Sequence, residues 1–207
     1  MLRAARWIAG LIKALFAATC VVATAAHAED IELRAAALQL ANEGLVLEAE
    51  FSFEFPPRLA DALANGVPLY FLVEFEMTRP RWYWIDERAA EKRLQLRLSY
   101  HALSRQYVVS NGPLEQQFES LDEALGVLRR IRNWVVGERI ALVSEARYEA
   151  AVRMRLDTSL LPKPIQLSAL TSNEWRFESA WNRFAYRSPL ILAPVESREL
   201  KPEVSTQ

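Results

Sequence analysis

The chain has few of the residues from which catalytic and metal sites are most often built. Its 207 residues include one cysteine, two histidines and six glycines. The cysteine, Cys20, lies in an N-terminal segment that we expect to be removed. What remains would contain no disulfide, no thiolate nucleophile and no cysteine-bound metal. The few glycines leave little room for a phosphate-binding loop, and neither a nucleophile-elbow nor a dinucleotide-binding motif occurs.

Histidine is also scarce where catalysis would need it. His101 follows Tyr100 in an alternating stretch, and we expect it to be exposed on a strand. A single histidine in the mature chain offers too few ligands for zinc. We therefore predict no catalytic, cofactor-binding or metal-binding residues and interpret the protein as not an enzyme. A hydrolase that uses two carboxylates stays open as an alternative.

The N-terminus has the features of a secretory signal peptide. Arg3 and Arg6 precede a mostly apolar run over residues 14–26, which ends in the small-x-small motif at Ala28. This pattern predicts cleavage after Ala28 and export to the periplasm. Lys13 interrupts the longer apolar stretch that a membrane span would need. The alternative is an uncleaved leader that anchors the protein in the inner membrane.

Three regions follow from these patterns. We predict a signal peptide over residues 1–28, a single β-rich domain over residues 29–188 and a disordered tail over residues 189–207. The whole chain has 25 basic and 26 acidic residues, and the leader holds three of the basic residues and no acid. The domain is therefore mildly acidic, which argues against a nucleic-acid partner. Its oligomeric state is left open.

Alternating apolar and polar residues dominate the domain, which is typical of half-buried strands. We predict an α+β, β-rich fold, a mostly antiparallel sheet or sandwich of about seven or eight strands. One clear amphipathic helix is predicted over residues 120–136, because Ser120 and Glu123 form a capping box ahead of helically spaced leucines. One or two short helices complete the fold, one of them over residues 58–65. The predicted strands cover residues 31–40, 45–55, 69–78, 92–103, 107–109, 114–118, 144–156 and 175–181.

On several of these strands, the outward-facing charged residues are either all acidic or all basic. Because opposite charges stabilise neighbouring strands, we expect acidic strands to lie beside basic ones on a solvated face. A calcium site built from the carboxylates is the alternative. The acidic set is Glu48, Glu50, Glu54, Glu74 and Glu76, and the basic set is Arg93, Arg97, Arg153 and Arg155.

An aromatic stretch after residue 78 is the candidate interaction site. Trp82 and Trp84 share one face if the chain is extended there, and arginines flank them at Arg79, Arg81 and Arg88. Tryptophan and arginine are favoured at protein interfaces. The alternative is that the tryptophans close the end of the core. Trp175 and Trp181 allow the same two interpretations, an exposed interaction site or the core, and for them we favour the core.

A polar and proline-containing block follows the strand predicted over residues 144–156. Asp157 and Thr158 are expected to bond local backbone groups where that strand ends, and Pro162 and Pro164 to fix an extended exit. The alternative is an extended segment that docks a partner. These four residues, with Trp175 and Trp181, form the candidate structural motif.

The stretch from Arg155 to Pro164, together with Trp175 and Ser179-Ala180-Trp181, resembles an uncharacterised family of exported proteobacterial proteins with a domain of unknown function. The resemblance covers about residues 31–186. It implies a signal peptide, no assigned activity, and a gene often adjacent to a membrane sensor kinase of the nitrogen-regulation type. It supplies no catalytic residues.

These observations favour a non-enzymatic interaction or accessory protein of the bacterial envelope, whose partner is a membrane or envelope protein and whose role is to modulate a membrane sensor. The first alternative is a carrier of a small ligand or lipid, with an apolar pocket between sheet and helix. The carboxylate-pair hydrolase is the second alternative. No cofactor is predicted.

Overall fold

The structure is a computed structural model that describes residues 31–80, 87–139, 142–171 and 173–190. In these residues the chain forms nine strands in two antiparallel sheets and three α-helices, so the predicted β-rich fold is confirmed. The strands are β1 (Ile31–Ala41), β2 (Gly44–Phe53), β3 (Leu69–Arg79), β4 (Glu87–His101), β5 (Gln106–Asn111), β6 (Leu114–Phe118), β7 (Arg130–Gly137), β8 (Arg147–Leu156) and β9 (Asn182–Arg187). The helices are α2 (Pro57–Ala64), α3 (Leu121–Arg129) and α4 (Lys163–Thr171), with 3₁₀ turns η2 over Thr158–Leu160 and η3 over Asn173–Trp175.

The smaller sheet has three strands in the order β1-β2-β7. A short turn at Asn42 and Glu43 joins β1 to β2, and Gly44 follows it at a φ of +136°. Only glycine adopts this backbone conformation without strain, and a Cβ at this position would collide with the Gly137 carbonyl oxygen at the end of β7. The β1–β2 turn can therefore pack closely against the end of β7 only with glycine at position 44.

The larger sheet has six strands in the order β6-β5-β4-β3-β8-β9. Consecutive strands β3 to β6 pair as hairpins, and β8 returns to pair with β3 on its other side. The strand β3 therefore lies at the middle of the sheet, between β4 and β8. This placement brings side chains nearly eighty residues apart into register across β3.

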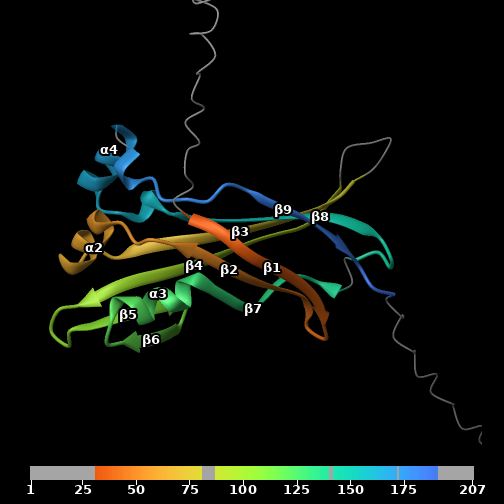
Figure 1. Ribbon diagram of the computed structural model, residues 1–207, viewed down its shortest axis with the longest axis horizontal. Coiled ribbons are helices and arrows are strands. Elements are labelled where there is room, and N and C mark those ends of the chain that lie inside the picture. Colours follow the sequence, from red (N-terminus) through yellow and green to blue (C-terminus); the bar gives the residue numbers. More distant parts are fainter. Residues whose placement is uncertain (1–30, 81–86, 140–141, 172, 191–207) are drawn as a thin grey trace, which may run out of the picture.

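The two sheets pack face to face and share one apolar core, and Figure 1 shows β1 and β2 lying across β3 and β8. The inward faces are those that the period-two pattern predicts, because alternate residues of a strand point to opposite sides. The fully buried side chains include Leu45, Leu47, Phe71, Phe75 and Leu98, which come from strands of both sheets. This arrangement is an antiparallel sandwich.

The helix predicted over residues 120–136 is wrong in its second half. The helix α3 begins where expected, and the Ser120 hydroxyl accepts a hydrogen bond from the Glu123 amide at 3.3 Å. It ends at Arg129, and the next eight residues form β7, which pairs with β2. Residues 130–137 contain isoleucine, valine and tryptophan, which suit a strand, and β2 offers them an open edge. In the strand Val136 is consequently buried, whereas its neighbour Val135 is 39% exposed.

The last predicted strand is displaced along the chain. Residues 175–181 do not form a regular strand: Trp175 ends η3, and residues 177–179 make one bridge to β8. The amide of Leu156 donates to the Phe177 carbonyl at 2.8 Å, and the Ser179 amide donates to the Met154 carbonyl at 2.8 Å. The regular strand β9 begins afterwards, at Asn182.

Candidate functional site: an arginine surface on the six-stranded sheet

The outer face of the six-stranded sheet carries a carboxylate surrounded by guanidinium groups. Glu74 lies on the central strand β3, directly opposite Arg93 of β4 on one side and Arg153 of β8 on the other. Arg155 is two residues further along β8 and faces the same side of the sheet. Alternation along the three strands therefore places one acid among three bases.

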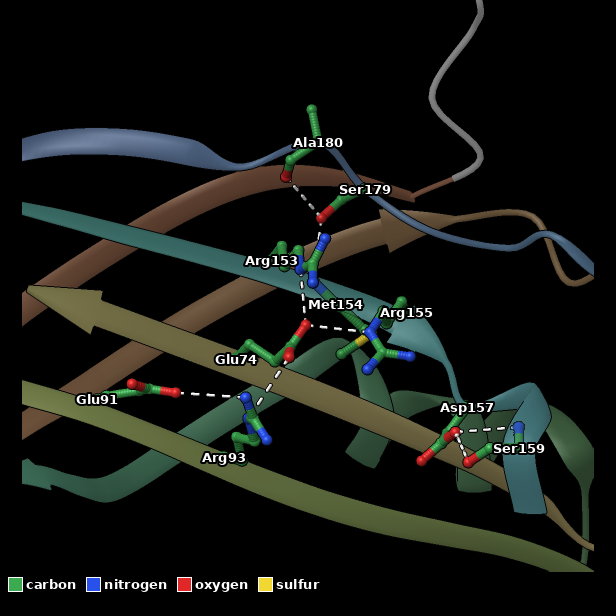
Figure 2. A network of polar contacts seen from close by, with 10 residues as sticks. All are labelled: Glu74, Glu91, Arg93, Arg153, Met154, Arg155, Asp157, Ser159, Ser179 and Ala180. Atoms are coloured by element: carbon green, nitrogen blue, oxygen red, sulfur yellow. Dashed lines mark hydrogen bonds and ion pairs between the residues drawn. The ribbon is translucent and has the colours of Figure 1, made fainter.

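The distances show a bonded network, which Figure 2 displays. The Nε atoms of Arg153 and Arg155 donate to Oε2 of Glu74 at 2.6 Å and 3.0 Å. Arg93 approaches Oε1 of Glu74 at 3.6 Å and also pairs with Glu91 at 3.3 Å. The prediction that acidic strands lie beside basic strands is confirmed here. The prediction that this face is solvated is wrong for Glu74, which is only 6% exposed because the long arginine side chains lie over it.

The environment of Glu74 keeps its carboxyl group ionised. Burial by itself raises the pKa of this carboxyl group. The hydrogen bonds and charges of Arg155 and Arg153 outweigh that effect, so the pKa of Glu74 lies below its usual value. The carboxylate is therefore a permanent negative charge within the network at neutral pH.

The network leaves positive charge at the surface. Glu74 is the only carboxylate that pairs with Arg153 or Arg155 among the described residues, so one negative charge serves both guanidinium groups. The guanidinium carbon of Arg153 lies 4.5 Å from the centre of the Trp181 ring, which orients the arginine by a cation–π contact. Arg97, exposed on the same face of β4, has no ion-pair partner in the described part of the chain. We call Arg93, Arg97, Arg153, Arg155 and Trp181 the arginine surface.

The candidate interaction site at the β3–β4 connection is only partly described. Arg81, Trp82 and Trp84 lie outside the described residues. Arg79 forms an ion pair with Glu87 across the two strands, and Arg88 pairs with Glu91 at 2.6 Å. The two flanking arginines that the structure describes are thus engaged with carboxylates of their own hairpin.

The two tryptophans near the C-terminus have different surroundings. Trp175 is 5% exposed and belongs to the core, as the sequence favours, with Arg58 over its ring at 5.1 Å. Its indole Nε1 has no hydrogen-bond partner among the described residues. Trp181 is half-buried and lies against Arg153 on the outer face, so the prediction that favours a core position for it is wrong.

The proline-containing block is structural but not extended. The Asp157 carboxylate accepts from the amide and hydroxyl of Ser159 at 3.1 Å and 2.6 Å, which confirms the predicted local bonding. Thr158 begins η2. The prediction of an extended exit is wrong, because Pro162 immediately precedes α4 and Pro164 lies in its first turn. Proline is compatible with the start of a helix, where backbone amides lack partners in any case. A docking segment that needs an extended proline stretch is therefore contradicted.

Sequence reasoning missed the arginine surface as a site. The charges of the individual strands were visible, and pairing of acidic with basic strands was expected. Which strands are neighbours depends on the return of β8 to β3, and no local pattern reports that connection. The position of Trp181 depends on the irregular segment 177–181, for which the sequence pattern predicts a regular strand.

Two of the hollows in the described part of the structure bear on the carrier hypothesis. One, of about 490 Å³, is on the outer face of the smaller sheet and includes Glu48, Glu50, Arg130 and Arg132 in its lining. The other, of about 280 Å³, lies beside Trp175. Charged side chains contribute to both linings, whereas the carrier hypothesis calls for an apolar pocket between sheet and helix.

Among the described residues, no group of three histidine, cysteine, aspartate or glutamate side chains is arranged to hold a metal ion. The described helices also include none with the length and apolar character of a membrane span. His101 is exposed at the end of β4.

The fold and the site define a two-sheet antiparallel β-sandwich with a basic outer face. The chain belongs to the family named domain of unknown function (DUF4390), whose model matches residues 28–185. No curated protein and no solved structure matches the chain.

Proposed function

We propose that this protein is an exported, non-enzymatic accessory protein of the bacterial envelope that binds an acidic segment of a membrane or envelope protein through the arginine surface. A membrane sensor is the partner we favour. The observation that carries the proposal is the charge imbalance around Glu74, where one buried carboxylate pairs with both Arg153 and Arg155. Arg97, on the same face of the sheet, has no acidic partner among the described residues.

The network prepares these arginines for a partner. Because Glu74 and Trp181 already orient Arg153, binding costs less side-chain entropy than it would for a free arginine. Arginine binds carboxylates through paired donors, and arginine and tryptophan are enriched among the residues that dominate interface energies. The side chains of Arg153 and Arg155 remain 28% and 29% exposed, so the surface is accessible.

Cross-linking in cells tests the proposal. The tagged full chain is cross-linked in the bacterial envelope, and the captured proteins and linked residues are identified by mass spectrometry. We expect one membrane or envelope protein to be linked to the arginine surface through an acidic segment. The substitution Arg97→Glu should reduce its capture by about tenfold, because it reverses the charge of an arginine that pairs with no described carboxylate and leaves the Glu74 network intact.

The matched control is Arg132→Glu, which makes the same charge reversal at an exposed position of β7 in the other sheet. Capture should be retained in that variant. Equal capture by both variants, or links that map away from the arginine surface, would contradict the proposal. Thermal unfolding of each variant separates loss of binding from loss of fold.

A further inference from the structure

Among the described residues, the strand β1 has a partner strand on one side only. It pairs with β2, and the order β1-β2-β7 makes it an edge of the smaller sheet. Outside that pairing, β1 makes no backbone hydrogen bond with the other described residues. Every second amide and carbonyl group of an edge strand points away from its neighbour, which makes the free side a template for another strand.

The other edges have features that discourage pairing, and β1 has few of them. The strand β6 has only five residues, most of them polar, and β9 carries Arg183 and Arg187. The strand β7 is irregular, with Asn133 at a φ of +51° and shifts in its register. By contrast, β1 is eleven residues long, and its segment 35–41, which follows the register shift at Arg34, is regularly paired and contains no charged residue. Long, uncharged edges are the ones that add strands.

The core is incompletely covered beside this edge. The strand β1 contacts β8, and the six-stranded sheet continues one strand further, to β9. The side chains of Phe184 and Tyr186 on β9 pack against the core and are only half-buried. Leu38 and Leu40 of β1 are half-buried on the same inner side. The smaller sheet thus ends one strand short of the apolar surface that the larger sheet offers.

A second copy of the chain that is joined antiparallel through its own β1 would overlap the first copy. A copy joined through its own β1 would carry its own β8 and β9 beneath that strand. Those strands would enter the space that β9 occupies. One added strand avoids this overlap, because it needs only the width of a single chain beside β1.

We propose that β1 accepts an extended segment of a partner protein as a fourth strand of the smaller sheet. The segment has apolar side chains at alternate positions, which cover Phe184, Tyr186 and Leu38, and small or polar residues between them, beside Ala35 and Ala37. It lacks proline, because its backbone amides bond to β1. This interface is separate from the arginine surface, which lies on the opposite face of the larger sheet, so either proposal can fail alone.

A phage-displayed library of random decapeptides, selected on the purified full chain, supplies the probe. We expect enriched sequences to alternate apolar and polar residues without proline. An enriched peptide should slow amide hydrogen exchange in residues 35–41 by about tenfold and leave β6 unchanged. The substitution Leu38→Lys places a charge at the half-buried edge and should weaken peptide binding by about tenfold.

The control is Leu114→Lys on β6, an exposed edge position of the larger sheet, where binding should be unchanged. Absence of enrichment, enriched peptides that protect another element, or equal binding by the two variants overturns the proposal. So does a dimer in sedimentation that Leu38→Lys dissociates, because the occupant would then be a second copy. Residues 35–41 could also prove to be protected from hydrogen exchange in the free chain and to lose that protection when residues 191–207 are deleted. The occupant would then be the chain itself, and the proposal would fail.

Discussion

At the scale of single residues, Glu74 shows how a charge can be stable inside a sheet. Its carboxylate would be unfavourable at 6% exposure without compensation, and two hydrogen-bonded arginines provide it. Glu76, two residues further along β3, lies directly opposite Glu91 and has no such partner among the described residues. The two glutamates of one strand face should therefore respond differently to the same substitution.

Replacing Glu74 with alanine should lower the free energy of unfolding by about 3 kcal/mol, because it leaves Arg153 and Arg155 without their carboxylate. Replacing Glu76 with alanine should change it by less than about 0.5 kcal/mol, or raise it slightly, since the change relieves the opposing charge of Glu91. Urea denaturation of both variants measures the difference. Equal losses would mean that the Glu74 network contributes no specific stability.

Acid should remove the contribution of Glu74. The pKa of this carboxyl group is lower in the folded chain than the value of 4.5 expected when it is unfolded. Its stabilisation is therefore present above about pH 4.5 and is lost as the pH falls through the lower, folded pKa. The stability difference between the native chain and Glu74→Gln, measured by urea denaturation from pH 7 to pH 3, should be constant at first and then shrink. A difference that grows below pH 4.5 would reverse the assigned direction of the pKa shift.

At the scale of elements, two glycines illustrate opposite requirements. Gly44 links the β1–β2 turn to the end of β7 and has a positive φ, whereas Gly126 lies within α3 with open space where a Cβ would be. Glycine is needed where the backbone is left-handed or closely approached, and is unfavourable inside a helix. The same substitution at these two sites separates the two effects.

Gly44→Ala should destabilise the fold by about 2 kcal/mol or more, since it adds a collision with the Gly137 carbonyl to an unfavourable φ. Gly126→Ala should stabilise it by up to about 1 kcal/mol, because alanine favours the helix and meets no atom. Thermal unfolding followed by circular dichroism measures both. If Gly44→Ala were as stable as the native chain, the close contact between the turn and β7 would be absent.

At the scale of the whole molecule, the two sheets depend on one core. Buried residues from both sheets and from α2 and α3 form a single contiguous cluster. Neither sheet has an apolar face that stays covered without the other, so partial unfolding would expose a large apolar area. The described domain should therefore unfold as one cooperative unit.

Cooperative unfolding predicts that two probes follow one curve. Tryptophan fluorescence, which reports on Trp134 and Trp175 in the core region among others, and far-ultraviolet circular dichroism, which reports on all strands, should give coincident urea transitions. Calorimetry supplies an independent check, because the calorimetric and van't Hoff enthalpies should agree. Separated transitions would show that the two sheets are independently stable.

Local sequence patterns predicted much of the sandwich. Alternation identified the inward faces of β2, β3, β4 and β8, because side-chain direction in a strand is set by the backbone itself. The capping residue of α3 was also identified correctly at Ser120. The end of that helix was not, because residues 130–137 have an apolar spacing that fits both a helix and a strand, and β2 decides between them.

The candidate site divides in the same way. Charge alone predicted that acidic strands would lie beside basic ones. The position of Asp157 at the end of a strand predicted its local hydrogen bonding, which the structure shows with Ser159. Three other features could not be predicted from neighbouring residues. These are the burial of Glu74, the contact of Trp181 with Arg153, and the position of Pro162 directly before α4. Each depends on contacts between segments far apart in the chain.

By itself, then, the sequence determined the strand-rich composition of the domain and the face of each long strand that enters the core. These properties are local, since they rest on residue type and on the two-residue period of a strand. The tertiary structure alone decided which strands are neighbours. That order places Arg93 and Arg153 on either side of Glu74 and leaves β1 at an edge beside a half-covered core, because strand order depends on long-range pairing and not on any single segment.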